Sequence, residues 1–213
     1  MMKIYLVRHG ESTANEEGIF LGQANRDLTE KGHIQAEKSA EFLSNAQIDA
    51  IISSDLDRAV QTAQHLADKK GMEVIKDQGI REINAGEWDF KKFDELPHLY
   101  PEEYAIWLTD VGRARCTGGE SFLETQERVY RAMEEIAKKY ENKTVAIYSH
   151  GTAIQSFICK VKGVPLSRVR QDLPYATNAS VTTLIYDNGK FTVTKYSHDD
   201  FLGDLVTALP KTV

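Results

Sequence analysis

Two short motifs join a histidine to a glycine and to a cationic or hydroxyl side chain. Arg8-His9-Gly10 follows an apolar run at residues 4–7, and Ser149-His150-Gly151 follows a second apolar run that ends at residue 148. A neutral histidine is nucleophilic near pH 7, and a guanidinium presents a planar fork of donors suited to phosphate oxygens. Glycine lets the backbone turn sharply beside a ligand. These residue types favour nucleophilic chemistry on a small anion.

A further cation, Arg58, is expected near the same point. Ser54 and Asp57 have the spacing of a capping box, which predicts a helix over residues 55–70 with Arg58 in its first turn. Open backbone amides at the start of a helix favour an anion. Arg58 is therefore a candidate phosphate ligand.

Each of these side chains also has a structural explanation of its own. Arg58 could be a charged residue on the surface of a helix, and His150 could be a hydrogen-bonded histidine of the core. Glu82 could be a carboxylate exposed to solvent. The two arginines and two histidines together, however, would repel one another unless a dianion sits among them. Their convergence would therefore indicate an anion site.

An alternation of apolar runs and amphipathic stretches predicts the elements that carry these motifs. Short strands are expected at residues 4–7, 49–52, 73–75 and 144–148, and helices at residues 30–45, 55–70, 121–140 and 152–161. Thr29 is expected to cap the first helix, whose Ile34 faces the sheet, and Ser121 with Glu124 forms a capping box for the third. This rhythm predicts an α/β fold with a mostly parallel sheet, which binds ligands at the carboxyl ends of its strands.

Two segments depart from that rhythm. Residues 84–119 are rich in charge, aromatics, proline and glycine, which predicts a small helical lid inserted into a single domain over residues 1–213. A two-stranded hairpin is predicted over residues 181–196, with its turn at Asn188-Gly189. The last residues, including Pro210, are expected to form a loose tail.

The composition limits the class of partner. The formal net charge is −6, with 41% hydrophobic and 27% charged residues, and an acidic chain is a poor candidate for non-specific nucleic-acid binding. No apolar stretch suits a signal peptide or a membrane span. Cys116 and Cys159 form no metal or redox motif. We expect a cytoplasmic protein with free thiols that binds a small molecule, and neither nucleic acid nor a membrane.

Five segments, in chain order, resemble the histidine phosphatase superfamily, also called the phosphoglycerate mutase-like family. They are residues 6–11, residues 53–63, the segment around Glu82, Ser149-His150-Gly151 and Asn178-Ala179-Ser180-Val181. The resemblance covers nearly the whole chain. It implies the three-layer phosphoglycerate mutase-like fold, with helices on both faces of the sheet, and an enzyme of the phosphatase branch.

The resemblance also implies roles for single residues. His9 would accept the phosphoryl group, and a carbonyl oxygen would accept a hydrogen bond from its other ring nitrogen and so keep the ring neutral. Glu82 would protonate the leaving oxygen and then activate water. The residues implied to bind the phosphate are Arg8, Asn15, Arg58 and His150. Gln23 falls where the family often contacts the substrate, and no metal or other cofactor is implied.

A cofactor-dependent phosphoglycerate mutase is the main alternative. Mutases of this family carry a longer insertion after the acid, with paired arginines that grip the substrate carboxylate, whereas the insertion here is short. The short insertion favours a phosphatase that hydrolyses small phosphate esters. Arg113 and Arg115 lie just before Gly118-Gly119 and are candidates for contact with a carboxylate or a second phosphate.

Two further alternatives come from other classes of protein. One is a catalytically weak phosphate-binding interaction protein, and the other is a metal hydrolase built from His9, Asp55 and His150. Asp27 stands where the family commonly has a proline, and Trp88-Asp89-Phe90 replaces a more usual Trp-Glu-Gly. These departures affect the shape of the lid, so the sequence leaves open which phosphate ester is used. It leaves the oligomeric state open as well.

Overall fold

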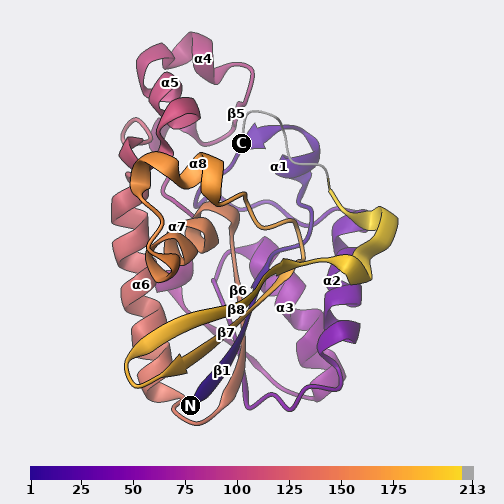
Figure 1. Ribbon diagram of the computed structural model, residues 1–213. Helices are drawn as coiled ribbons and strands as arrows, with labels where there is room; N and C mark the ends of the chain where they lie inside the picture. Colours follow the sequence, from indigo (N-terminus) through magenta and orange to yellow (C-terminus); the bar gives the residue numbers. More distant parts are fainter. Residues whose placement is uncertain (208–213) are drawn as a thin grey trace.

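The computed structural model of the protein describes residues 1–207, which are built around a six-stranded sheet (Figure 1). In order across the sheet the strands are β4 (Val74–Lys76), β3 (Ala50–Ser53), β6 (Thr144–Ser149), β1 (Met2–Arg8), β7 (Val181–Asp187) and β8 (Lys190–His198). The first four are parallel, and β7 is antiparallel to both of its neighbours. The mostly parallel sheet predicted from the sequence is confirmed.

β1 is an interior strand because it pairs with β6 on one side and with β7 on the other. Ile4 and Leu6 belong to the apolar core on one face of the sheet, and Val7 belongs to the core on the other face. A strand covered on both faces needs apolar residues at successive positions, which explains its uninterrupted apolar run. The strand therefore delivers Arg8 and His9 to a buried position.

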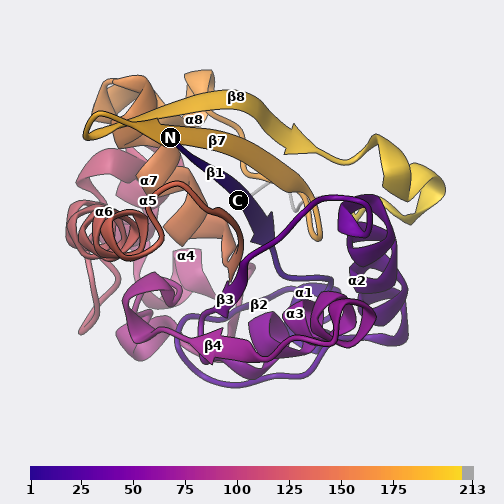
Figure 2. The same ribbon diagram turned by 90° about the horizontal axis from the view of Figure 1, so that it is seen from below.

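Helices cover both faces of the sheet. α2 (Glu30–Leu43) and α3 (Asp57–Lys70) lie on one face, and α6 (Phe122–Lys139) and α7 (Gly151–Lys162) lie on the other (Figure 2). The two helices of each pair pack against each other. This three-layer arrangement is the one that the resemblance implied.

Two predicted helix starts are confirmed, but the predicted inward orientation of Ile34 is not. The side chain of Thr29 caps α2, and Ser121 with Glu124 forms the capping box of α6. The prediction that Ile34 covers the sheet is wrong, because its side chain is 44% exposed. It lies about 200° around the helix from the buried Ala36.

The predicted capping of α3 by Ser54 is also wrong. The helix begins at Asp57, and its N-cap residue Leu56 makes no side-chain capping bond. The Ser54 hydroxyl is engaged elsewhere, with its Oγ 2.8 Å from Nε2 of His150. A contact between distant parts of the chain has replaced the local one.

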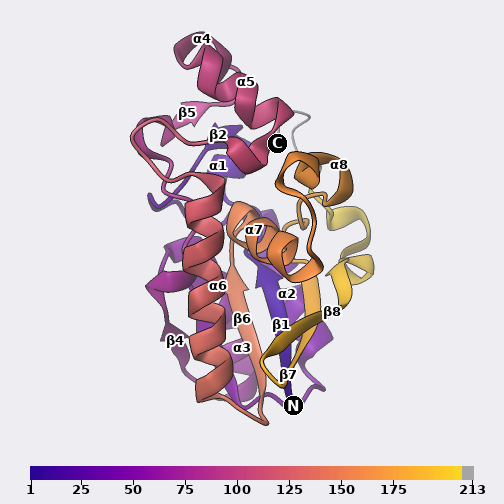
Figure 3. The ribbon, with the colours of Figure 1, turned by 60° about the vertical axis from the view of Figure 1, so that its left-hand side comes forward.

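Residues 84–119 form the lid, which lies at the end of the sheet opposite the N terminus (Figure 3). They contain η2 (Gly86–Trp88), β5 (Lys91–Lys92), α4 (Leu96–Leu99), α5 (Pro101–Thr109) and η3 (Val111–Arg113). β5 pairs with β2 (Ile19–Phe20), which follows the short helix α1 (Thr13–Glu16). Neither α1 nor β2 is among the elements predicted from the sequence, because elements this short show no periodic pattern.

Aromatic side chains hold this lid in place. The ring centroid of Phe20 lies 5.2 Å from that of Trp107 and 5.4 Å from that of Trp88, and Tyr104 packs on Trp88 at 5.7 Å. These residues belong to the same apolar core as the buried face of α6 and α7. The lid is therefore packed onto the sheet as part of one continuous core.

The predicted hairpin joins β7 to β8. Asn188 and Gly189 have φ angles of 48° and 78°, as a type I′ turn requires. The other described elements are η1 (Gln78–Ile80), η4 (Leu166–Arg168), α8 (Val169–Asp172) and η5 (Asp200–Leu205). Pro210, expected in a loose tail, lies outside the described residues. None of the helices within residues 1–207 has the length and apolar character of a membrane span.

Candidate active site

The carboxyl ends of three neighbouring strands bring the candidate residues together. β6 lies between β1 and β3, so the turns that follow these strands meet. His9 follows β1, His150 follows β6, and Arg58 lies in the first turn of α3. The ring centroids of the two histidines are 5.2 Å apart, and Arg58 Nε lies 3.3 Å from His9 Nε2. The structure thus brings these three residues into one site.

His9 is buried, and the main chain fixes its ring. Its Nδ1 lies 2.7 Å from the carbonyl oxygen of Gly10, and its own carbonyl accepts a hydrogen bond of 3.1 Å from Asn178 Nδ2. Burial, and then the charges of Arg58 and Arg8, holds the pKa of His9 well below its ordinary value. A neutral ring that donates from Nδ1 keeps its lone pair on Nε2. A neutral imidazole of this tautomer has the chemistry of a nucleophile.

Arg8 and Arg58 are both buried, and carbonyl groups orient them. Arg8 Nη1 donates to the oxygen of Ala176 at 2.7 Å. Arg58 donates from Nη1 to Ala24 at 2.9 Å and from Nη2 to Gly22 at 2.7 Å. Burial lowers the pKa of both guanidiniums, that of Arg58 to about 10, so both stay charged at neutral pH. The site holds two fixed positive charges.

His150 is fully buried, and a hydroxyl group sets its hydrogen bonding. Burial, followed by the charge of Arg58, lowers the pKa of His150 well below its ordinary value. Ser54 Oγ lies 2.8 Å from Nε2 of His150. When the hydroxyl donates to Nε2, the neutral ring carries its hydrogen on Nδ1. Within residues 1–207 this Nδ1 has no partner, which leaves it as a donor for an anion.

Glu82 is held at the N terminus of α7. Its Oε1 accepts from the amides of Ile83 at 2.8 Å and Ala153 at 2.9 Å, and its Oε2 accepts from the amide of Thr152 at 3.0 Å. The carboxylate lines the same pocket as His9. A carboxyl group fixed beside a nucleophile is positioned to exchange protons with a bound ligand.

Asn15 and Gln23 have different places in the structure. Asn15 lines the pocket, and its Oδ1 accepts from Asn178 Nδ2 at 3.2 Å and from the amide of Ser12 at 3.1 Å. Its Nδ2 is therefore the atom left to bind an anion. Gln23 is not among the described residues that line the pocket, and its Nε2 donates to the main-chain oxygen of Glu82 at 3.1 Å.

The pocket has a volume of about 80 Å³, whereas one water molecule needs only about 10–15 Å³. It therefore has room for a small phosphate ester. Tyr175, Asn178 and Thr207 also line it, and sequence reasoning assigned none of them a role. Asn178 lies in one of the motif segments, which was a usable signal. Tyr175 and Thr207 belong to no motif and reach the pocket only through the folding of the last third of the chain.

Asp55, proposed as a metal ligand in one alternative, faces Arg81. The two side chains form a bidentate ion pair, with 2.6 Å between Arg81 Nε and Asp55 Oδ1. The guanidinium also lowers the pKa of the Asp55 carboxyl. Among the side chains that the structure describes, no group of three or more His, Cys, Asp or Glu residues is arranged to hold a metal ion.

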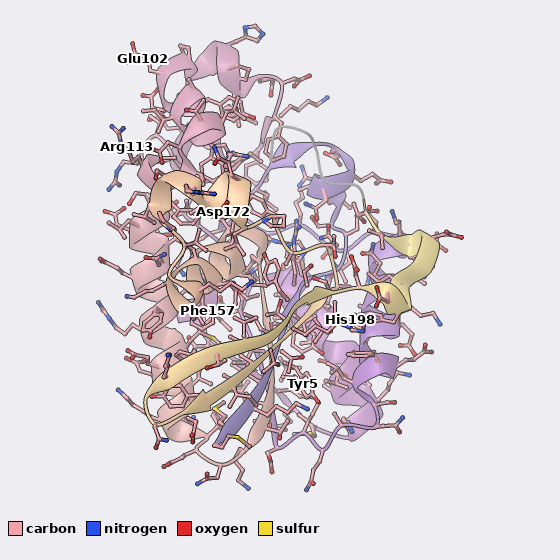
Figure 4. All side chains as sticks on the ribbon, in the orientation of Figure 1. Tyr5, Glu102, Arg113, Phe157, Asp172 and His198 are labelled. Carbon is pink, nitrogen blue, oxygen red and sulfur yellow. The ribbon has the colours of Figure 1, made fainter. Side chains whose placement is uncertain are left out.

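Arg113 and Arg115, proposed to contact the substrate, lie away from the pocket. Arg113 is 78% exposed and projects from the outer surface of the lid (Figure 4). Arg115 donates to Gly119 at 2.8 Å and to Glu124 at 2.6 Å. Neither residue lines the pocket, so a substrate-binding role for these two arginines does not fit the structure.

Comparisons with known proteins give a consistent result. The sequence model of the Histidine phosphatase superfamily (branch 1) matches residues 4–199. Phosphoserine phosphatase 1 of Hydrogenobacter thermophilus is 38% identical over 79% of this chain and 80% of its own. A probable phosphoglycerate mutase GpmB of Erwinia tasmaniensis is 34% identical over 80% of each chain. The structure of Bacillus stearothermophilus YhfR matches with a TM-score of 0.90 at 29% identity, over 95% of this chain and 100% of that chain.

Proposed function

Because the chain belongs to the histidine phosphatase superfamily, we propose that it is a phosphomonoesterase that hydrolyses small phosphate esters through a phosphohistidine at His9, without a metal ion. The observation that carries the proposal is the hydrogen bond between His9 Nδ1 and the Gly10 carbonyl. It leaves Nε2 with its lone pair beside the guanidinium of Arg58. A nucleophile and a counter-charge for phosphate are thus already in contact.

The reaction has two steps. In the first, His9 Nε2 attacks phosphorus, the bond from phosphorus to the alcohol oxygen breaks, and Glu82 gives its proton to that oxygen. In the second, Glu82 takes a proton from water, the water oxygen attacks phosphorus, and the bond from phosphorus to nitrogen breaks. Inorganic phosphate leaves, and both His9 and Glu82 return to their starting states.

The phosphoryl group carries its charge on three equatorial oxygens, and donors around His9 stabilise that charge. Arg8 and Arg58 supply the positive charge. His150 Nδ1, which has no partner among the described residues, and Asn15 Nδ2 supply further donors. Such donors act without a metal because they are fixed before the substrate arrives.

A phosphoglycerate mutase is the second candidate, since several relatives carry the name of a probable phosphoglycerate mutase. A mutase must hold a substrate that has both a phosphate and a carboxylate. The lid arginines that were candidates for this contact, Arg113 and Arg115, lie off the pocket. Hydrolysis therefore fits this chain better than transfer between two positions of phosphoglycerate.

The test is steady-state release of inorganic phosphate from p-nitrophenyl phosphate, 3-phosphoglycerate and several sugar phosphates. A mutase assay with 2,3-bisphosphoglycerate runs beside it. We expect hydrolysis that is unchanged by chelator, lost in His9→Ala and retained in the control His98→Ala, whose side chain is exposed on the lid.

Three results would contradict the proposal. Isomerisation of phosphoglycerate that outruns phosphate release would identify a mutase. Loss of activity in chelator would indicate a metal hydrolase. Wild-type activity no higher than that of His9→Ala would indicate a phosphate-binding protein without catalysis.

A further inference from the structure

Besides the candidate phosphate ligands, the pocket has an apolar wall. It is formed by Ile19, Phe20, Leu21, Ile83, Phe93 and Trp107. These side chains come from three separate parts of the chain: the β2 segment, the residue after Glu82, and the lid. Each part contributes apolar groups to the place where the alcohol portion of a phosphate ester has to lie.

The wall is rigid and formed before any ligand binds. The Phe20 ring lies 5.2 Å from Trp107 and 5.5 Å from Phe93, and Trp107 lies 5.7 Å from Trp88. Ile83 and Trp107 are at most 1% exposed. A close-packed aromatic cluster of this kind does not rearrange cheaply to admit a polar group.

The wall carries no charge that could balance a second anionic group. Arg8, Arg58 and Glu82 are the charged side chains among the described residues that line the pocket, and all three belong to its phosphate end. Both terminal nitrogens of Arg58 already donate to carbonyl oxygens, as does Nη1 of Arg8. These bonds fix both guanidiniums in place, so neither is free to turn toward a second anionic group.

Three other arginines of this region do not line the pocket. Arg170 donates from Nε to the main-chain oxygen of Trp107 at 2.7 Å. Arg115 is paired with Glu124, and Arg113 is 78% exposed. Thr207, which also lines the pocket, is neutral.

We infer that the preferred substrates are phosphate monoesters of uncharged alcohols with an aromatic or alkyl group, and that esters with a carboxylate on the alcohol are disfavoured. This inference rests on the proposed phosphatase function. An apolar group gains free energy when it leaves water for the wall. A carboxylate at the same place would lose its hydration without gaining a counter-ion.

The experiment compares esters of primary alcohols, so that the leaving oxygen is alike in each. kcat/KM is measured for 2-phenylethyl phosphate, n-butyl phosphate, glycerol 3-phosphate, 3-phosphoglycerate and O-phosphoserine. We expect the first two to exceed the two carboxylate esters by at least about ten-fold, the discrimination that an apolar pocket gives for small changes in a substrate.

Variants of Phe93 test whether the wall is responsible. Phe93 is only partly buried, so substitution there disturbs the core less than substitution of the buried Trp107 would. Phe93→Ala should reduce kcat/KM for 2-phenylethyl phosphate more than for glycerol 3-phosphate. Phe93→Arg should raise the ratio for 3-phosphoglycerate over n-butyl phosphate by about ten-fold. The control is Leu99→Ala, since Leu99 is 52% exposed on the same lid and does not line the pocket.

The outcomes distinguish failure of the apolar subsite from failure of the phosphatase function. Phosphoserine or 3-phosphoglycerate hydrolysed as well as 2-phenylethyl phosphate would overturn the apolar subsite and leave the phosphatase function standing. An unchanged order of substrates in both Phe93 variants would also overturn it. Absence of His9-dependent phosphate release from every ester would instead refute the phosphatase function itself.

Discussion

Acidification is expected to destabilise the folded protein through its two buried histidines. His9 and His150 both have a pKa held well below the ordinary value by burial and by neighbouring guanidiniums. In the unfolded chain each histidine takes up a proton near a pKa of about 6.5. The unfolded state therefore binds more protons as the pH falls, and stability present above that pKa is lost below it.

The size of the effect follows from this difference. Between about pH 7.5 and about pH 5.5, each histidine that stays neutral in the folded state lowers the free energy of unfolding by about 1.4 kcal/mol. The two together lower it by about 2.7 kcal/mol, out of the ~5–15 kcal/mol typical of a domain. Carboxyl groups with a lowered pKa, such as those of Asp55 and Glu120, titrate below this range and add little.

Urea unfolding at the two pH values, followed by the fluorescence of the buried Trp88 and Trp107, measures this loss. His9→Gln and His150→Gln should each reduce it to about 1.4 kcal/mol, whatever they do to stability at the higher pH. His98→Gln, on the exposed surface of the lid, should keep the wild-type loss. If both core variants keep the full wild-type pH dependence, the two rings take up protons in the folded protein as readily as in the unfolded chain, and burial does not hold them neutral.

Three further outcomes follow from the contacts of the site. Ser54→Ala should lower kcat about ten-fold with a smaller change in KM, because His150 loses the bond that sets its tautomer, and Ser54→Thr should restore it. Arg58→Lys should lower kcat/KM about 100-fold in the same hydrolysis assay, because an ammonium lacks the planar fork of donors. Arg113→Ala and Arg115→Ala should stay within about two-fold of wild type, and a loss of ten-fold or more would place these arginines at the substrate.

The positions of the main site residues were predictable because they follow strong local signals. The apolar run before Arg8 and the one before His150 each define a strand, and the glycine after each histidine marks its end. Ligand sites of parallel sheets lie at such ends. Local pattern and topology were therefore enough to bring Arg8, His9 and His150 together without knowledge of the lid.

The residues that shape the alcohol side of the pocket were not predictable in the same way. Phe93 and Trp107 reach the pocket through packing on Phe20, which is far from both in sequence and lies in a two-residue strand. Ser54 carried a local signal for a cap that the structure does not use, and its hydroxyl bonds to a histidine 96 positions away. Such tertiary contacts override local preference, and a single sequence does not show them.

The charge balance of the site favours a doubly charged phosphate group. The sequence suggested four cationic groups, whereas the low pKa values of His9 and His150 leave Arg8 and Arg58 as the positive charges. A phosphate dianion brings two negative charges, which match the two guanidiniums, whereas a monoanion brings only one. The donors around His9 are therefore better matched to the dianionic form of a phosphate monoester.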